Sequence, residues 1–385
     1  MSLNLDKSRW KRVAFGDVVR NVNETIRDLE AAGINRVIAM EHMDPGELKV
    51  SRWGSTEDGT TFTRRVKPGQ TLFGKRRAYQ RKVAYAEFDA ICSGDIYTFE
   101  TDGTQLLGEL LPFLVQSNGF FEHALGTSAG SLSPRTNWRD LKDFEFDLPP
   151  LDEQKRIADL LWTVERHRRA LTKVHAEVVR SQSELVEQFV RAAPGREVNL
   201  GDVLKIVRGG SPRPINEYLT DSPDGLHWIK IGDVPPDGKF IDRTAQRIKP
   251  SGLPKTRTVK PGDFILSNSM SFGRPYIVRI DGCIHDGWLS LSDVGGRWRT
   301  DYLYYLLRSY GVQSQFRQGA GGSTVKNLNT DIVSRVSVVH PSLEDQDSLL
   351  EQMASASSAV ASVAKESDAV KAIKSALSET VFGGD

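Results

Sequence analysis

The segment Pro150-Leu151-Asp152-Glu153-Gln154 opens a stretch in which an apolar residue returns at every seventh position, and Pro341-Ser342-Leu343-Glu344-Asp345-Gln346 opens a second such stretch. The first series consists of Ile157, Val164, Leu171, Val178 and Leu185. The second, 192 residues later, consists of Leu349, Ala356, Val363, Val370 and Leu377. A heptad sustained over about four repeats is typical of a coiled coil. Neither heptad stretch contains a proline or glycine until Pro194-Gly195 ends the first and Gly383-Gly384 ends the second. We therefore expect two helices of about 35–40 residues.

The shared heptad register of the two helices predicts that they pack against each other. The second helix must return past the first, so we expect an antiparallel pair with one globular domain at each end. The alternative is that each helix packs only on the globular part that precedes it.

Shorter motifs outside the helices also recur, which indicates an internal duplication. Val13-Ala14-Phe15-Gly16-Asp17-Val18 returns 185 positions later as Val198-Asn199-Leu200-Gly201-Asp202-Val203. Val66-Lys67-Pro68-Gly69 returns 193 positions later as Val259-Lys260-Pro261-Gly262. At that same offset, Ala90-Ile91-Cys92-Ser93-Gly94 aligns with Cys283-Ile284-His285-Asp286-Gly287. The chain therefore reads as a tandem repeat whose unit is about 190 residues long.

The segments before the two helices alternate short apolar runs with glycine, proline and aspartate, which predicts strands joined by turns. One helix is expected in each segment, around 106–118 and 300–314, where leucines recur at helical spacing. The predicted fold class is α/β (α+β): two globular domains in tandem, separated by two long antiparallel coiled-coil helices, with a pseudo-twofold internal repeat. The expected boundaries are 1–150 for the first globule, 151–193 for the first helix, 194–342 for the second globule and 343–385 for the second helix.

Composition restricts the class of protein. Of the 385 residues, 39% are hydrophobic and 26% are charged, which is ordinary for a globular chain. No apolar run approaches the roughly 20 residues of a transmembrane helix, and the first residues lack the pattern of a secretion signal. Two cysteines, Cys92 and Cys283, are too few for a disulfide scaffold or a four-cysteine zinc site. We therefore expect a cytoplasmic protein without a metal centre of its own.

Motifs for catalysis are scarce. The sequence has no GxxxxGK[ST] loop, no HExxH and no CxxC pair, and Leu148-Pro149-Pro150-Leu151 lacks the polar and aromatic residues of an amino-methyltransferase motif. A nuclease site built on Glu153 and Lys155, with Asp140 or Asp143, is one alternative. It is disfavoured because Glu153 lies at the start of a helix, where an acidic residue is favourable anyway, and because the second copy does not repeat the pattern.

Local charge is more informative than the net charge of +1. The first copy carries a basic stripe without any acidic residue between Thr60 and Ala86, and the second copy carries one in the matching stretch, interrupted only by Asp263. The eight cations of the first stripe are Arg64, Arg65, Lys67, Lys75, Arg76, Arg77, Arg81 and Lys82. Those of the second are Arg243, Arg247, Lys249, Lys255, Arg257, Lys260, Arg274 and Arg279. A single stripe could be a solvated charged face, but its recurrence at the same place favours DNA binding.

Side chains that can contact phosphates or base edges are interleaved with these cations and occupy two further loops, 130–138 with its counterpart 322–327, and 208–213. The candidate DNA-binding residues of the first copy are Lys75, Arg76, Arg77, Tyr79, Gln80, Arg81, Lys82, Ser131, Arg135 and Asn137. Those of the second copy are Arg208, Ser211, Arg213, Lys230, Asn268, Ser269, Ser271, Arg274, Ser323, Thr324, Lys326 and Asn327.

The whole chain resembles the specificity (S) subunits of type I restriction–modification systems. The most specific marker is the segment Leu148–Leu161, which is similar to the family's entry into its first conserved helix; the segments His340–Gln346 and His227–Asp233 add support. The resemblance implies that each globule is a target recognition domain reading one half of a split, asymmetric DNA site. It also implies that the helices form a spacer that fixes the unread gap and docks two methyltransferase subunits.

By the same resemblance, restriction/translocase subunits join the assembly, and S-adenosylmethionine, ATP and magnesium belong to the partner subunits. This chain would then bind no cofactor and catalyse no reaction. The alternatives are a solitary DNA-binding adaptor without methyltransferase partners and, less favoured, a nuclease.

Overall fold

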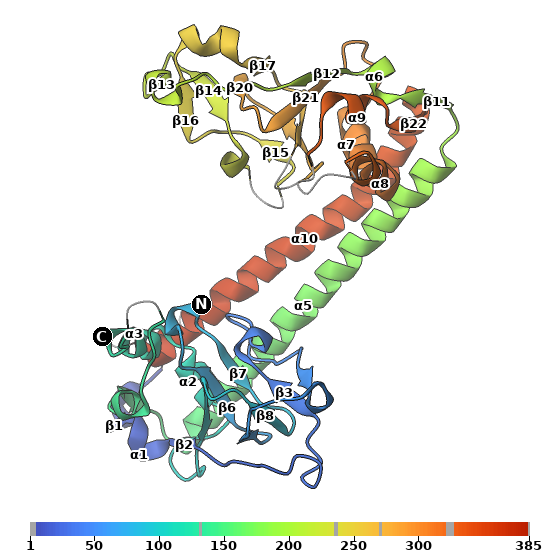
Figure 1. Cartoon of the computed structure of the whole chain (residues 1–385). Helices are drawn as coiled ribbons and strands as arrows, with labels where there is room; N and C mark the ends of the chain where they lie inside the picture. The colour runs from blue at the N-terminus through green and yellow to red at the C-terminus, as the bar shows by residue number, and fades with distance from the viewer. Residues whose placement is uncertain (1–4, 131–132, 235–237, 269–271, 321–326, 384–385) are drawn as a thin grey trace. The chain divides into compact units, whose positions relative to one another are not determined.

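The structure is a computed structural model that describes residues 5–130, 133–234, 238–268, 272–320 and 327–383 (Figure 1). The chain forms two compact units. Unit 1 comprises Met1–Lys173 together with Lys365–Asp385, and unit 2 comprises Val174–Ala364. Each unit therefore contains one globular part and a portion of each long helix. The sequence predicts four parts, in which each long helix is separate from its globule. The division into two compact units does not test those boundaries, so they stay a prediction.

The globular part of unit 1 is built from short strands in three antiparallel or mixed sheets, with sheet orders β1-β10, β2-β9-β6-β7 and β4-β3-β8-β5. The strands are β1 (Lys11–Ala14), β2 (Arg20–Val22), β3 (Arg36–Ile38), β4 (Gly54–Ser55), β5 (Arg64–Val66), β6 (Thr71–Gly74), β7 (Val83–Tyr85), β8 (Ala90–Cys92), β9 (Ile96–Glu100) and β10 (Glu145–Leu148). The helices are α1 (Phe15–Val18), α2 (Leu111–Val115), α3 (Asn118–Gly126) and α4 (Trp138–Leu141), with 3-10 turns that include η2 (Met40–His42) and η4 (Ala78–Gln80).

The globular part of unit 2 repeats this arrangement, with sheet orders β11-β22, β12-β21-β18-β19-β15 and β13-β16-β14-β20-β17. The strands are β11 (Arg196–Asn199), β12 (Lys205–Arg208), β13 (Leu219–Thr220), β14 (Leu226–Ile229), β15 (Phe240–Ile241), β16 (Gln246–Ile248), β17 (Arg257–Val259), β18 (Phe264–Ser267), β19 (Pro275–Val278), β20 (Gly282–Ile284), β21 (Trp288–Ser292) and β22 (Ser337–His340). The helices are α6 (Leu200–Val203), α7 (Thr300–Arg308), α8 (Tyr310–Gly319) and α9 (Thr330–Ser334), and the 3-10 turns include η6 (Ile231–Asp233).

Strand pairing confirms the duplication and corrects one alignment. In unit 1, β3 runs parallel to β8 with Ile38 opposite Cys92; in unit 2, β14 runs parallel to β20 with Ile229 opposite Ile284. Cys92 therefore corresponds to Ile284, at offset 192, and not to His285 as the offset of 193 suggested. The difference arises because the loop between β6 and β7 is one residue longer than the loop between β18 and β19.

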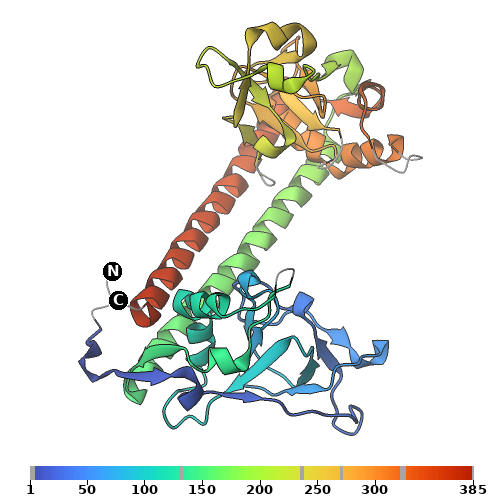
Figure 2. The same ribbon diagram turned by 60° about the vertical axis from the view of Figure 1, so that its left-hand side comes forward.

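The two long helices are α5 (Leu151–Ala192, 42 residues) and α10 (Leu343–Phe382, 40 residues). The first is slightly longer than expected and the second lies at the upper end of the expected range. Within each unit they lie side by side (Figure 1 and Figure 2) and run antiparallel. In unit 1, Lys374 donates to Glu165 at 2.8 Å, and in unit 2 Gln182 donates to Ser357 at 2.9 Å. Leu377 of α10 lies in the core of unit 1 and Val186 of α5 lies in that of unit 2, so the alternative of helices packed only on their preceding globules is wrong.

The heptad positions are mostly covered. Ile157, Leu171, Leu349, Val370 and Leu377 are buried, and Val164, Val178, Ala356 and Val363 are half-buried. Leu185 departs from the prediction: it is 41% exposed, whereas Val186 is 6% exposed. A strict heptad drifts by about 20° per repeat around a straight α-helix, so after four repeats the buried position has moved by nearly one residue.

The single helix expected before each long helix is instead two helices. Residues 106–118 contain only the short α2, and α3 begins anew at Asn118; residues 300–314 are divided between α7 and α8. A serine caps each second helix, because Ser117 accepts from the backbone N–H of Phe120 and Ser309 from that of Val312. The spacing of leucines predicts that these residues are helical, but it does not reveal the serine caps at which a new helix begins.

A glutamine near the start of each long helix, Gln154 in α5 and Gln346 in α10, joins the helix to the globular part. Gln154 and Gln346 are fully buried. Gln154 accepts from the N–H of Leu107 at 2.9 Å and donates to the carbonyls of Gln105 and Pro149. Gln346 makes the equivalent bonds, accepting from the N–H of Arg299 at 2.7 Å and donating to the carbonyls of Arg297 and Pro341. All six partners are backbone groups, so both buried amides are satisfied without any particular side chain.

A buried ion network holds the helices of unit 1 to its globular part. Arg168 of α5, 8% exposed, donates to Glu165 at 2.7 and 3.1 Å and to Glu47 of the loop after η2 at 2.8 Å. Lys374 of α10 donates to the same Glu165. Burial raises the pKa of Glu165, but the Arg168 and Lys374 bonds and charges outweigh it, so that pKa lies below its usual value. Unit 2 has Val360 and Ser357 at the positions of Arg168 and Glu165, and therefore lacks these charges.

Candidate nucleic-acid interface

In unit 1 the predicted contact residues gather where two loops meet. The loop between β6 and β7 runs from Lys75 to Lys82 and includes η4. Its backbone is bonded to the loop that precedes α4, because the N–H of Arg77 donates to the carbonyl of Pro134 at 2.8 Å. Arg76 and Arg135 form an isolated antiparallel bridge between the same loops. The basic stripe and the 130–138 loop, which are about 55 residues apart in sequence, thus form one surface.

Asp95, in the turn between β8 and β9, lies beneath these arginines. Its carboxylate is 3.5 Å from Arg76 and 3.2 Å from Arg135. Other acidic residues pair with the start of the stripe: Glu24 contacts Arg65 and Lys67. The stripe that contains no acidic residue in sequence is therefore partly neutralised in space by carboxylates from other segments.

Several candidates of unit 1 are held by neighbouring groups. Lys75 lies over the Tyr97 ring at 4.8 Å, and burial, together with the charge of Arg64, lowers the pKa of Lys75. Lys82 donates to the carbonyl of Met40 at 2.7 Å. Arg81 donates to Asn118 at 2.7 Å. Gln80 is half-buried, and Asn137 stands just before α4 at 3.5 Å from Asp140.

Arg77 and Tyr79 are exposed candidates of this cluster. Tyr79 is 55% exposed and Arg77 is exposed, with a left-handed backbone at φ 55°. A non-glycine residue in that region is uncommon and is kept there by surrounding contacts. Here the backbone bond to Pro134 fixes Arg77, so its guanidinium is presented by a defined loop.

The candidates of unit 2 converge on Asp286 in the turn between β20 and β21. Ser211 donates to its carboxylate at 2.9 Å, and Arg213 lies 3.6 Å from it. Arg208 and Asn268 both donate to its backbone carbonyl. Burial raises the pKa of Asp286, but the Ser211 hydrogen bond and the neighbouring positive charges outweigh this, so the carboxyl has a pKa below its usual value.

A hollow of about 820 Å³ opens beside this cluster. Trp228 lines its floor, and Arg213, Lys230, Gln246 and His285 surround it. Lys230 begins η6, where its backbone N–H donates to Asp233 at 2.8 Å. In unit 1 the N–H of Ala39 donates to His42 at 3.0 Å in the same way. This shared turn aligns the His227–Asp233 segment with residues 36–42 of the first copy.

The remaining candidates are placed as follows. Arg274 stacks on Tyr276, with its guanidinium carbon 5.7 Å from the ring centre, and Asn327 is exposed. Six candidates lie outside the described residues: Ser131, Ser269, Ser271, Ser323, Thr324 and Lys326. The role of each candidate in DNA binding stays a prediction.

The sequence model of one protein family, described as the type I restriction modification DNA specificity domain, matches residues 8–179. Residues 8–179 therefore carry the DNA specificity domain of type I restriction–modification systems. A curated member, the specificity subunit of the type I restriction enzyme EcoDI from Escherichia coli, is 30% identical over 122 residues. That match covers 31% of this chain and 27% of the relative, so it spans about a quarter of the relative's length.

Two solved structures share the fold along nearly the whole chain. The S subunit of a type I restriction–modification system from M. genitalium matches with a TM-score of 0.58 and 14% identity, over 100% of this chain and 99% of its own. A chain from a study of complex assembly and conformational transition in a type I system matches with a TM-score of 0.63 and 19% identity, over 98% of both chains. At these identities the likeness concerns the fold alone.

Glu153, one of the residues considered for a nuclease site, has a structural contact. Glu153 accepts from the indole N–H of Trp10 at 3.1 Å. Among the described residues, no group of three or more His, Cys, Asp or Glu side chains could hold a metal ion. Within the same residues, none of the helices combines the length and the apolar character needed to cross a bilayer.

Sequence reasoning missed the acidic centres and two side chains of the unit 2 hollow. Asp95 and Asp286 lie one aligned position apart in the turns that follow β8 and β20, so an acidic residue in the same turn of each copy was visible. Their role was not, because the arginines that they pair with lie in other loops. Gln246 and His285 come from separate strands and turns, and no local motif connects them with Lys230.

Proposed function

We propose that this chain is the DNA-specificity subunit of a type I restriction–modification complex, and that each globular part reads one half of a bipartite, asymmetric DNA site. The observation that carries the proposal is the duplicated cluster: a carboxylate in the same turn of each copy, Asp95 or Asp286, orders arginines from neighbouring loops. Two ordered sets of arginine, amide and hydroxyl groups suit the recognition of two half-sites.

The paired helices set the length of the unread gap between the half-sites and dock two methyltransferase subunits, which modify adenine. Restriction/translocase subunits complete the complex, which acts in the cytoplasm. The subunit itself is not an enzyme: S-adenosylmethionine, ATP and magnesium are bound by its partners. The family's description as a DNA specificity domain and the likeness to a chain studied in a type I assembly support this scheme.

Genome-wide methylation, sequenced in cells with and without this gene, tests the proposal. We expect a split, asymmetric adenine-methylated motif in the first cells and its complete absence in the second. Complementation with the gene is the control and should restore the same motif. If methylation is identical in both, the chain does not direct a methyltransferase, and a solitary DNA-binding adaptor becomes the better description.

Arg77→Ala is expected to weaken binding through the first half-site only. A bidentate contact from arginine to guanine contributes about 1–3 kcal/mol of discrimination, so the affinity for intact DNA should fall by roughly tenfold to a hundredfold. Duplexes with either half-site scrambled distinguish the two domains in a binding titration. Arg20→Ala is the matched control, because Arg20 is an exposed arginine of the same globule that pairs with Glu100 at the opposite end of β9. Equal losses at both half-sites would contradict separate readers.

A further inference from the structure

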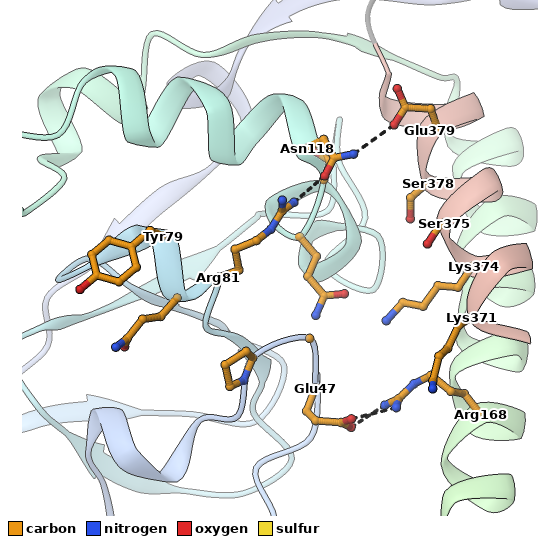
Figure 3. Close-up of a pocket in the computed structure, with 15 residues that line it drawn as sticks. Glu47, Tyr79, Arg81, Asn118, Arg168, Lys371, Lys374, Ser375, Ser378 and Glu379 are labelled. Carbon is orange, nitrogen blue, oxygen red and sulfur yellow. Dashed lines mark hydrogen bonds and ion pairs between the residues drawn. The ribbon is translucent and has the colours of Figure 1, made fainter. Parts of the chain in front are cut away.

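A second feature adjoins the reading loop of unit 1, on the side that faces the helices. A hollow of about 610 Å³ lies between η4, the start of α3 and one face of α10 (Figure 3). Figure 3 shows Lys371, Lys374, Ser375 and Ser378 on the α10 side and Tyr79 and Arg81 on the other. Cavities of this volume are large enough for small-molecule ligands, so the hollow can admit the phosphodiester groups of a nucleic-acid strand.

The charge of this hollow is positive. Four cations line it, Arg81, Arg168, Lys371 and Lys374, against two acidic residues, Glu47 and Glu379. Arg168 and Lys374 are committed to the buried ion network. Arg81 has the neutral amide of Asn118 as its partner.

Lys371 is accessible to a ligand. Its partner is Asp368, one turn earlier on the same helix, at 3.1 Å, and the side chains of the two are 60% and 76% exposed. Such an exposed pair contributes little and is readily exchanged for another anion. Lys371 can therefore turn its ammonium group to a phosphate in the hollow.

The other lining groups favour a phosphate backbone over a protein partner. Serine hydroxyls, amides and a tyrosine accompany the cations, for example Ser375, Ser378, Asn118 and Tyr79. These are the side chains that contact phosphate and sugar in protein–DNA complexes. The centre of a protein interface is instead rich in apolar anchors and poor in charge, and the lining of this hollow includes no leucine, isoleucine, valine, methionine or phenylalanine among the described residues.

A hollow of about 480 Å³ lies at the corresponding place in unit 2, where the lining also includes Val179, Val186 and Val360. Gln182, Ser183 and Glu187 of α5 stand at the positions of Lys374, Ser375 and Glu379, and Ser309 stands at that of Ser117. Here the positive charge comes from the globular part, through Arg274 and Arg308, because α5 carries Val179 in place of Lys371. Both copies thus keep a net positive hollow at the same place, built from different residues.

We propose that these two hollows are sequence-independent binding sites for the DNA backbone, so that the helices themselves grip the phosphates of the strand beside each reading loop. In unit 1 the contact is made by Lys371 of α10, and in unit 2 by Arg308 of α7. This inference rests on the proposed DNA-binding function. It adds that the long helices, and not only the reading loops, line the site that contacts the DNA, and that this site contacts the phosphate backbone.

The test is a salt titration of the full-length chain with a random-sequence duplex of about 30 base pairs, since a backbone contact does not depend on sequence. Each phosphate contact contributes about −0.9 to the slope of log affinity against log salt concentration. We expect Lys371→Gln to make this slope shallower by about 0.9 and to weaken binding several-fold at low salt. Arg308→Gln should have a similar effect. Lys365→Gln, an exposed lysine of α10 outside the hollow, should leave the slope unchanged.

The outcomes separate the two proposals. If the wild-type chain does not bind the duplex with a salt-dependent affinity, the DNA-binding function fails and this inference fails with it. If the wild type binds but both variants keep its slope, only this inference is overturned. A variant that keeps the slope but loses assembly with methyltransferase subunits would overturn it too, because the hollow would then be a protein-docking site. Thermal unfolding of each variant, expected to match the wild type for Lys371→Gln, verifies that the fold is intact.

Discussion

Arg168→Ala is expected to lower the free energy of unfolding of unit 1 by about 3–5 kcal/mol, the loss typical of breaking a buried ion pair. The guanidinium of Arg168 is the shared partner of Glu165 and Glu47, and the side chain of Glu165 is only 1% exposed. Removing the guanidinium leaves the buried Glu165 with Lys374 as its remaining partner, and it frees the Glu47 loop from the helix. Hydrogen exchange measured by mass spectrometry resolves the two units, and faster exchange should be confined to unit 1 segments.

Two further variants test the cause of that effect. Arg166→Ala removes an exposed arginine of the same helix that donates a hydrogen bond to Thr163. This change should alter the free energy of unfolding by less than about 0.5 kcal/mol. The fourfold change Glu47→Gln, Glu165→Gln, Arg168→Met and Lys374→Met removes all four charges of the network together. It should recover much of the lost stability, because replacing a whole buried network costs far less than breaking it. An Arg168→Ala protein as stable as Arg166→Ala would show that the network does not hold the unit together.

Adding one heptad to each long helix is expected to replace the methylated motif completely by one with a longer gap and the same two half-sites. The insertions lie between Leu171 and Val178 and between Val363 and Val370, where both helices are regular. Seven residues lengthen an α-helix by about 10.5 Å, which equals roughly three base pairs of B-DNA. A whole heptad retains the packed face, so the pairing of the helices is preserved.

Methylation sequencing of cells that carry the lengthened chain measures this change directly. A heptad inserted into α5 alone is the control: it shifts one helix against the other and should abolish methylation. Retention of the original gap by the doubly lengthened chain would rule out the helices as the ruler. Altered half-sites would instead point to a disturbance of the reading loops.

The sequence predicts this architecture well where the signal is periodic. Heptad spacing, with the glycine and proline limits, located both helices, and the recurring motifs predicted the duplication that strand pairing confirms. The departures have local causes. A serine cap split each expected helix, the heptad drifted off Leu185, and a single extra residue between β6 and β7 shifted one alignment.

The candidate site was predictable only in part, because charge patterning along the chain does not report pairing across it. The stripe around Arg76 and the 130–138 loop were each predicted as contact points. Their meeting, and the neutralisation of Arg76 by Asp95, depend on segments that the fold brings close. The hollow below the stripe could not be foreseen, since Lys371 lies almost 300 residues from Arg81 in the chain. Such contacts follow from the return of α10 to unit 1.

The buried glutamines have a consequence for how such proteins diversify. Gln154 and Gln346 bond only to main-chain groups of the segments that they hold. A main-chain partner survives every substitution that leaves the local backbone unchanged, so mutations in the reading loops leave this joint intact. The two joints also present the same hydrogen-bond pattern, and a globular segment excised at one could be accepted at the other. Under the proposed function, new target sequences would then arise by exchange of whole segments between copies or between genes, without selection having to rebuild the connection to the helix.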